Sequence, residues 1–362
     1  MSGATLTANF AGISTQYAPR EIGFRYGTSE SNLTSEAYYR GTFTTSNGSY
    51  SVDIELPSDE GRYFYQAFMS VWDEESGTFV EIHSDVAFFD KPGQTFSGTT
   101  LNSDWMELPA SPSSLGNRKL VVMRATMGGK NTRNYSILYD PEYYAATWVA
   151  FNYCKAHRGS GSLSSWTQNP QIDDALEVDV SSTYQTGYDR GHQIPNALRN
   201  GESSMQKQTY YFTNSTPQYG DFNKGIWQNL ETAERNIIDN NSASATDTLY
   251  IVTGPVYRTV DENESYSTIR QGGKNVPVAN YYYRVILKVR RNASGTVTAA
   301  SAIGFWMPHS NSIADDDYTN YACSVSSIEE KTGFTFFANL PSSVSDSAKA
   351  NKSWTTFKNF SF

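Results

Sequence analysis

A stretch rich in Pro, Gly and Ser separates two differently patterned parts of this chain. Residues 93–116 show no apolar periodicity, which is typical of a linker between domains. Because 362 residues exceed the usual size of one domain, the stretch predicts one domain at 1–92 and a second at 117–362. Trp105 and Met106 are the residues expected to dock the linker against a domain.

The first 92 residues have the pattern of a small all-β domain. Short alternating runs rich in Tyr, Phe, Val and Thr are separated by turn-like clusters such as 46–49 (SNGS) and 57–61 (PSDEG). Such runs predict the strands of a β-sandwich. The segments 23–31 (GFRYGTSES) and 61–68 (GRYFYQAF) resemble fibronectin type III-like modules of bacterial surface and secreted proteins, with another immunoglobulin-like sandwich as the alternative.

Residues 117–362 combine strand and helix patterns, which predicts an α+β domain with a mixed sheet. Apolar side chains recur at helical spacing in 221–238, and Asp221 is the expected N-cap of this helix. A capping box at 326–329 (SSIE) and the stop residue Gly333 predict a short helix near the end of the chain. The expected strands are 119–126, 135–139, 146–154, 248–253, 281–289 and 297–307.

Negative charge is concentrated in the first third of the chain. The net charge is −9, but residues 1–115 hold 5 Lys and Arg against 15 Asp and Glu, and the remaining residues hold 23 against 22. Polyanions such as nucleic acids bind proteins largely through cations. The distribution leaves the C-terminal domain free to present a locally basic cleft.

Several classes of protein are disfavoured. No stretch approaches the roughly 20 apolar residues of a membrane-spanning helix. Cys154 and Cys323 have no CxxC partner, which disfavours thiol redox chemistry and a structural zinc site; the two either form a disulfide or stay free. The 4 histidines are scattered, without an HxxxH or HxxEH pair, which disfavours a zinc hydrolase.

The composition favours a place outside the cytoplasm. Tyr, Ser, Thr and Asn are abundant, and only 18% of the residues are charged. The first residues lack a basic stretch followed by an apolar one, so a signal peptide is either absent or already removed. We expect a secreted, periplasmic or cell-surface protein, with the N-terminal domain or the removed signal providing any surface attachment. The oligomeric state is left open.

The segment 189–192 (DRGH) combines side chains suited to hydrolysis. His192 offers an imidazole that titrates near neutral pH, beside the guanidinium of Arg190. Gly191 leaves room for the close approach of a backbone or ligand. Phosphodiester hydrolysis needs a base for water, a cation for the charge that develops on phosphate, and help for the departing oxygen. The segment supplies the first of these and a candidate for the second.

Further motifs follow in a fixed order after 189–192. They are 213–218 (TNSTPQ), 223–227 (NKGIW), 230–231 (LE), 234–235 (ER), 253–257 (TGPVY), 302–308 and 328–334 (IEEKTGF). In order, spacing and residue type this set resembles the DNA/RNA non-specific endonuclease family of the ββα-metal (His-Me finger) superfamily. The resemblance covers most of residues 117–340. It implies a nuclease domain built around a ββα-metal motif, with DNA and RNA as substrates.

The resemblance assigns roles to individual residues. It implies that His192 activates the attacking water and that Asn223 is the single direct protein ligand of Mg²⁺, with Mn²⁺ as the alternative ion. Glu231 falls eight residues after Asn223, about 80° around a helix, so its carboxylate can reach a metal-bound water. The resemblance also implies that Arg190 and Arg235 engage the phosphate or hold Glu231. Asp189 and Asn214 are implied to have positioning roles.

One position departs from the family pattern. Where the family carries an arginine in a VAYR-like strand, this chain has Asn152 at the end of 149–152 (VAFN). A cation that holds phosphate is therefore missing or comes from Lys155, Arg158 or Lys224. The departure keeps open an alternative function: an extracellular nucleic-acid-binding module that retains the nuclease fold with little or no turnover. His309 likewise stands where the family commonly has Asn.

Overall fold

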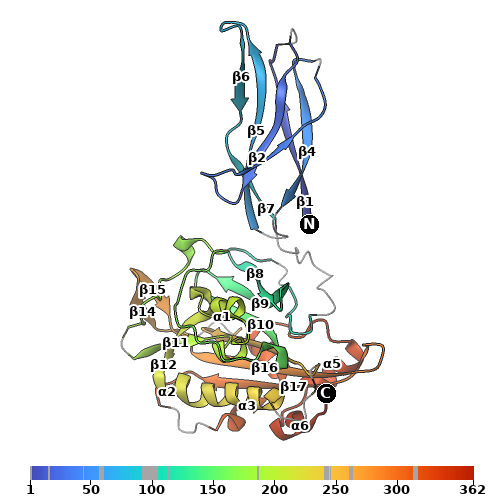
Figure 1. Cartoon of the computed structure of the whole chain (residues 1–362). Helices are drawn as coiled ribbons and strands as arrows, with labels where there is room; N and C mark the ends of the chain where they lie inside the picture. Colours follow the sequence, from blue (N-terminus) through green and yellow to red (C-terminus); the bar gives the residue numbers. More distant parts are fainter. Residues whose placement is uncertain are drawn as a thin grey trace. The chain divides into compact units, whose positions relative to one another are not determined.

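The computed structural model divides into two compact units, residues 1–95 and 96–362, each with its own core (Figure 1). It describes the whole chain except residues 1, 15–16, 44, 57–60, 92–104, 112–113, 186, 240–243, 245, 261–263 and 313–316. None of the helices in this described part combines the length and the apolarity that crossing a membrane requires.

The described residues of the first unit form two β-sheets with a shared core. In β4, Tyr50, Val52, Ile54 and Leu56 are buried at alternate positions, as one face of a strand requires, and they pack with Phe24 of the other sheet. The likeness to fibronectin type III-like modules stays a prediction. One sheet pairs β1 (Ser2–Phe10) with β4 (Gly48–Leu56), and the other contains β2 (Arg20–Gly27), β3 (Ser35–Tyr38), β5 (Gly61–Asp73), β6 (Thr78–His83) and β7 (Ala87–Lys91).

The second unit is built on a seven-stranded sheet in the order β18-β17-β16-β13-β10-β9-β8. Every neighbouring pair is antiparallel, so the predicted mixed sheet is wrong in this respect. Short turns account for the antiparallel pairing of strands that follow each other directly in the chain: Gly128 and Gly129, with φ of 56° and 77°, join β8 to β9 as a tight hairpin. The strands are β8 (Lys119–Met127), β9 (Lys130–Asp140), β10 (Ala145–Tyr153), β13 (Leu249–Val256), β16 (Tyr281–Arg291), β17 (Val297–Pro308) and β18 (Ala322–Cys323).

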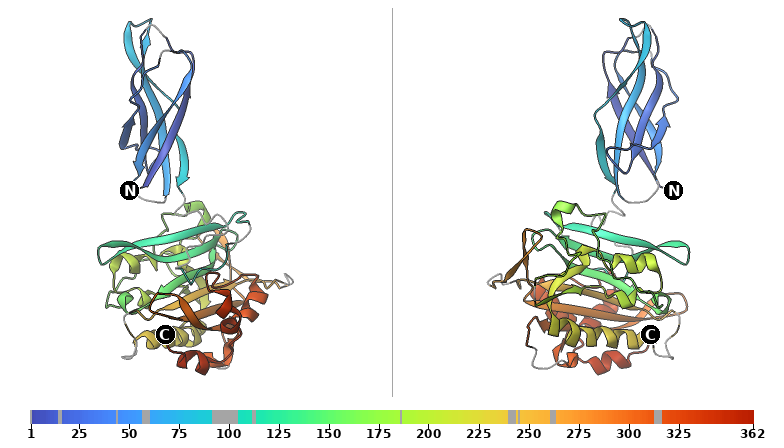
Figure 2. Two further views of the ribbon diagram at one scale, coloured as in Figure 1. Left: turned by 90° about the vertical axis from the view of Figure 1, so that its right-hand side faces the viewer. Right: turned by 60° about the vertical axis from the view of Figure 1, so that its left-hand side comes forward.

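Both faces of this sheet are covered, which accounts for its nearly continuous apolar strands. Along β10, Val149 and Phe151 enter the core that contains the long helix α3 (Gln228–Asp239) and α6 (Trp354–Asn359). Trp148 and Ala150 enter the opposite core, which contains α4 (Val325–Thr332) and α5 (Ser342–Lys349). Figure 2 shows the sheet between these layers.

A pair of antiparallel strands leads into the long helix on one face of the sheet. β11 (Tyr188–His192) pairs with β12 (Ser215–Tyr219), and the chain continues through α2 (Gly220–Phe222) and a π-type turn (Asn223–Trp227) into α3. The predicted helix 221–238 is therefore present but kinked at Gly225, where φ is −95° and ψ −111°. This strand–strand–helix order matches the ββα arrangement that the family resemblance implies.

Two predicted helix starts are wrong. Tyr219 rather than Asp221 is the N-cap of α2, because β12 runs directly into the helix and the Tyr219 N–H is bound by His309 Nε2 at 2.9 Å. α4 begins after Ser324, whose hydroxyl accepts the Ser327 N–H at 3.1 Å, so the capping box at 326–329 does not form. Gly333, with φ of 71°, ends α4 as predicted.

The remaining described elements are short. They are the strand pair β14 (Thr268–Gln271) and β15 (Lys274–Pro277), the helix α1 (Ser203–Gln208), and the 3₁₀ turns Lys155–His157, Asp174–Leu176, Asn196–Leu198, Phe212–Asn214 and Tyr318–Tyr321. Cys154 and Cys323 are free, so no disulfide joins them.

The end of the predicted linker belongs to the second unit. Trp105, Met106 and Leu108 are buried in its core, and Glu107, fully buried, pairs with Arg133 at 2.7 Å between Oε1 and Nη2. The Arg133 guanidinium also lies 4.0 Å from the Trp105 ring. The rest of the linker prediction falls largely on residues 92–104 and 112–113, which lie outside the described residues.

Candidate active site

A pocket opens where the end of β11 faces the first turns of α3. Its volume is about 210 Å³. Four residues singled out in the sequence, His192, Asn223, Glu231 and Arg235, meet in it although up to 43 positions separate them. The full lining is His192, Pro195, Asn196, Ala197, Asn223, Lys224, Gln228, Glu231, Thr232 and Arg235.

The antiparallel strand pair β11–β12 brings His192 to the rim of this pocket. Its register pairs Gly191 with Thr216 and His192 with Ser215. A Cβ atom at Gly191 would lie 2.2 Å from the Gln218 side chain, so this position needs glycine. Without glycine, either the buried Gln218 side chain or the strand that carries His192 would have to move.

The His192 ring is held by aromatic neighbours. Its centroid lies 4.6 Å from that of Trp166 and 5.0 Å from that of Tyr210, and its carbonyl accepts the Trp227 Nε1–H at 3.3 Å. Nε2 is buried and has no hydrogen-bond partner among the described residues. Burial, followed by the charge of Arg190, lowers the pKa of His192 to about 4. The imidazole is therefore neutral at physiological pH, and Nε2 is available as a proton acceptor.

Asn214 fixes the turn that follows His192. Its Oδ1 accepts the Ile194 N–H at 3.0 Å, and its Nδ2 donates to the carbonyls of Ile194 at 3.0 Å and Thr209 at 2.7 Å. The side chain is fully buried and does not line the pocket. The contacts of Asn214 therefore suit it to position His192 from behind.

Asn223 stands at the start of the kinked helix with its amide oriented by Asp189. Nδ2 donates to Asp189 Oδ2 at 3.1 Å, which leaves Oδ1 as the atom able to bind a cation. Lys224 Nζ lies 2.8 Å from the same carboxylate oxygen. Asp189 thus forms an ion pair with Lys224 and also orients the Asn223 amide.

Glu231 faces the pocket from α3 and is backed by a buried cation. Its Oε1 lies 3.7 Å from Nη1 of Arg284 on β16, and neither atom has a hydrogen-bond partner among the described residues. Arg284 is fully buried; its Nε donates to Glu234 Oε1 and its Nη2 to Glu234 Oε2, the latter at 2.7 Å. Burial raises the pKa of Glu231 to about 8, and the charge of Arg284 opposes this shift.

Of the two arginines expected near phosphate, only Arg235 lines the pocket, and its Nη2 donates to Thr232 Oγ1 at 3.1 Å. Arg190 instead donates Nη1 to the carbonyls of Val180 and Ser181 at 3.0 and 2.9 Å, with its guanidinium 5.4 Å from the Trp166 ring. Through Trp166 it supports the His192 ring rather than entering the pocket.

Asn152, the departure from the family pattern, lies away from the pocket on β10. Its carbonyl accepts Nη2 of the buried Arg199 at 2.7 Å. Among the proposed substitutes for the missing cation, Arg158 pairs with Asp239 at 2.9 Å, and only Lys224 lines the pocket.

The sequence analysis missed Arg284, Glu234 as its partner, and the aromatic support of Trp166 and Tyr210. One signal was present: an arginine within the apolar run 281–289 is unusual, because arginine is seldom fully buried unless it is paired.

The donors in the pocket suit a hydrated hard cation. Within the described residues no group of three or more His, Cys, Asp and Glu side chains is arranged to hold a metal. Asn223 Oδ1 and the carboxylate of Glu231 offer oxygen atoms on one pocket wall. Mg²⁺ prefers oxygen ligands and keeps several of its waters, so one amide and a carboxylate acting through water fit it.

The chain is similar to several known proteins. The family described as DNA/RNA non-specific endonuclease matches residues 119–343. A nuclease of Serratia marcescens is 33% identical over 209 residues, which cover 57% of this chain and 73% of that protein. The mitochondrial endonuclease G of Bos taurus is 27% identical over 219 residues, 58% of this chain and 69% of that protein. The protein is thus a nuclease, and its chain belongs to the DNA/RNA non-specific endonuclease family.

A solved structure of an EndoG/EndoGI complex also resembles the chain. It shares 22% sequence identity and has a TM-score of 0.47, over 57% of this chain and 84% of that one.

Proposed function

We propose that the protein is a Mg²⁺-dependent endonuclease that hydrolyses phosphodiester bonds in DNA and RNA without sequence selection and leaves 5′-phosphate and 3′-hydroxyl ends. The observation that carries the proposal is the unpartnered Nε2 of a neutral His192 in the same pocket as Asn223 and Glu231. Mn²⁺ has similar ligand preferences and is the expected substitute ion.

His192 acts as the general base. Because its pKa is lowered, the imidazole does not carry the second proton of an imidazolium at neutral pH, and its free nitrogen can take a proton from the attacking water. Trp166 and Tyr210 fix the plane of the ring, and Asn214 fixes the turn behind it. The base is thus held in one orientation before substrate arrives.

Asn223 Oδ1 would bind the ion directly, and the Glu231 carboxylate would bind one of its waters. Burial favours the neutral form of Glu231, but the charge of the bound ion, added to that of Arg284, would favour the ionised carboxylate. When bound, Mg²⁺ supplies positive charge for the phosphate and the departing oxygen. Asp189 orients the Asn223 amide, and Arg284 orients the Glu231 carboxylate from behind.

Arg235 and Lys224 are the cations that line the pocket, and they hold the substrate phosphate. Phosphate contacts carry no base information, which accounts for cleavage without sequence selection. Arg190 acts by supporting Trp166, and Asn152 leaves the family's arginine contact unfilled. We also propose that the protein works outside the cytoplasm and that the first unit serves in surface attachment.

Cleavage of supercoiled plasmid and of a structured RNA tests the proposal. We expect both to be cut with Mg²⁺, weakly or not at all after EDTA, and again after Mg²⁺ is restored. The cut ends should be labelled by kinase only after phosphatase treatment, because they carry 5′-phosphate. Binding of both nucleic acids without any cleavage would contradict the proposal and favour a binding module that has lost turnover.

A further inference from the structure

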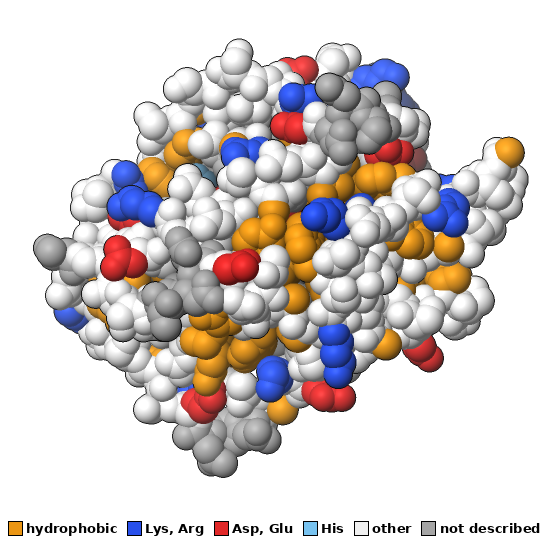
Figure 3. Space-filling view, turned by 90° about the horizontal axis from the view of Figure 1, so that it is seen from below, with side chains coloured by type: hydrophobic (Ala, Val, Ile, Leu, Met, Phe, Trp, Pro, Cys, Tyr) orange, Lys and Arg blue, Asp and Glu red, His pale blue; other side chains and the backbone are white. Residues whose placement is uncertain are grey.

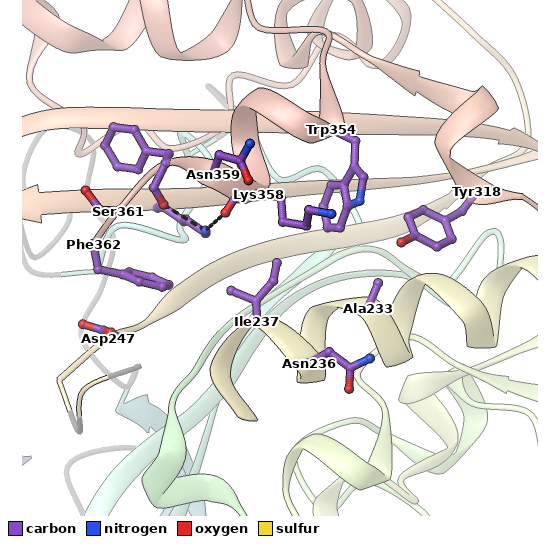
Figure 4. A pocket seen from close by; sticks show the side chains of 12 residues that line it. Ala233, Asn236, Ile237, Asp247, Tyr318, Trp354, Lys358, Asn359, Ser361 and Phe362 are labelled. Carbon is purple, nitrogen blue, oxygen red and sulfur yellow. Dashed lines mark hydrogen bonds between the residues drawn. The ribbon is translucent and has the colours of Figure 1, made fainter. Parts of the chain in front are cut away.

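A second and larger hollow lies along α3 (Figure 4), and the α3 residues that line it are not those that line the catalytic pocket. Its volume is about 610 Å³. Ala233, Asn236 and Ile237 of α3 form one wall, and Tyr318 and Trp354 lie opposite. The remaining lining residues are Asp247, Lys288 and the segment 358–362.

Lys288 of β16 holds in place the wall of the hollow that residues 358–362 form. Lys288, almost fully buried on β16, donates Nζ to the carbonyls of Lys358 and Phe360 at 3.1 Å each, the two bonds dashed in Figure 4. Its ammonium also lies 4.8 Å from the Phe362 ring centroid and 5.1 Å from that of Phe357. The hollow is therefore built by specific contacts rather than left by loose packing.

The lining combines flat apolar surfaces with polar edges. Tyr318, Trp354 and Phe362 offer aromatic surface, and Asn236 and Asn359 offer amide groups. Asp247 is the acidic residue of the lining, against two lysines. On the face of the second unit seen in Figure 3, hydrophobic side chains are exposed among scattered basic and acidic ones. This combination suits a planar heterocycle attached to an anion.

A third hollow of about 420 Å³ also lies along α3, and Asp317 is among its lining residues. It shares Thr232 with the catalytic pocket, and Ala233, Asn236 and Tyr318 with the large hollow. The lining residues of the three hollows therefore follow one another around α3, from Glu231 and Arg235 to the aromatic residues, and we call this row of hollows the track.

We propose that this track binds a single-stranded stretch of the substrate, with one base near the cleaved bond seated in the large hollow against Phe362. The inference rests on the proposed function. A polynucleotide held at one phosphate must continue across the surface, and the adjoining track offers it a place. Stacking on aromatic side chains tolerates every base and so agrees with cleavage without sequence selection. A peptide or a second copy of this chain would have no reason to enter the catalytic pocket, which the same track reaches.

Fluorescence of 2-aminopurine tests the seat directly. The base analogue is placed at successive positions from the cleaved bond in a single-stranded oligonucleotide, which is bound with Ca²⁺ in place of Mg²⁺. We expect quenching confined to one or two positions, and its loss in Phe362→Ala. Equal fluorescence at every position, or quenching that survives Phe362→Ala and Lys358→Glu alike, would overturn the inference.

Kinetics on substrates of different length separate this inference from the proposed function. For Lys358→Glu we expect KM to rise about tenfold for a long single strand relative to a dinucleotide, the size of one lost stacking or phosphate contact. Lys352→Glu makes the same charge change on an exposed residue outside the lining and should leave this ratio unaltered. An unchanged ratio in Lys358→Glu with normal plasmid cleavage would refute the track alone, whereas no cleavage of any substrate by the unaltered protein would refute the function.

Discussion

Replacing Arg284 by methionine removes the cation that stands behind Glu231. The guanidinium is fully buried and makes two hydrogen bonds to the equally buried Glu234. Breaking such a pair leaves an uncompensated charge and costs about 3–5 kcal/mol. Because a domain is stable by only about 5–15 kcal/mol, the single variant should unfold at clearly lower urea concentration. A loss of activity in this variant alone would therefore not separate positioning from folding.

The double variant Arg284→Met/Glu234→Met separates the two effects. It removes both buried charges and replaces them with apolar side chains of similar length, a change that is often neutral for stability. Glu231 nevertheless loses the cation 3.7 Å from its Oε1. Loss of a residue that orients a metal-binding group typically lowers metal affinity or activity by about 10–100-fold. We expect the double variant to fold but to need about tenfold more Mg²⁺ for half-maximal activity.

Mg²⁺ titration of cleavage, urea unfolding and direct Mn²⁺ binding to the free protein measure these effects. Arg133→Met/Glu107→Met is the matched control, because it removes another buried ion pair, one that lies outside the pocket lining. The control should keep the Mg²⁺ dependence of the unaltered protein. If the Arg284 double variant folds and also keeps that dependence, Arg284 is structural only and the argument for its positioning role is wrong.

Three further predictions follow from the same geometry. Asn223→Ala should lose most activity and recover part of it at high Mg²⁺, because the amide is one ligand among waters; an unchanged Mg²⁺ dependence would mean that another residue is the ligand. The pKa of His192 is lowered from 6.5 to about 4, so the base stays neutral well below pH 6.5. At saturating Mg²⁺, kcat/KM should therefore begin to fall on the acid side only as the pH approaches about 4; a fall centred near pH 6.5 would contradict the burial argument. The second unit is compact by itself, so the fragment 96–362 should fold and cleave DNA. Residues 1–95 hold 5 Lys and Arg against 13 Asp and Glu, so their removal should leave the affinity for DNA at low salt equal or higher, and the difference should shrink as salt rises. A folded but inactive fragment would show that the first unit shapes the cleft.

The residue at which that protein fragment should begin follows from the structure rather than from the sequence. A fragment that begins at Ser114, near the end of the predicted linker, would lose Trp105, Met106 and Leu108 from the core of the second unit. Such a fragment should be less stable than 96–362. A Pro, Gly and Ser-rich stretch reveals where periodicity ends, but it does not reveal which of its aromatic residues pack against a distant strand.

Local patterns predicted much of the fold and most of the pocket. The apolar runs of β10, β13, β16 and β17 and the helical spacing of 221–238 are properties of neighbouring residues, so they could be found in one sequence. The order and spacing of the family motifs located His192, Asn223, Glu231 and Arg235, which the fold then brings into one hollow.

What escaped the sequence analysis depends on contacts between distant segments. Arg284 lies 50 residues beyond Glu234, and only the pairing of β13 with β16 beneath α3 brings it to Glu231. The kink at Gly225 interrupts a regular apolar pattern that by itself predicts an unbroken helix. Arg190 shows the converse case: its motif suggests phosphate contact, but the carbonyls of Val180 and Ser181 bind its guanidinium.

The most direct test of the account is the single-turnover cleavage rate of His192→Ala beside its affinity for the same oligonucleotide. His192 acts only while the proton moves, so its removal should lower the rate about a hundredfold to ten-thousandfold. Affinity should stay close to that of the unaltered protein, and urea stability should fall only by the packing that the ring makes with Trp166 and Tyr210, because Nε2 makes no hydrogen bond among the described residues that folding would lose. A variant that folds, binds and still cleaves at more than about a tenth of the original rate would show that another group is the base.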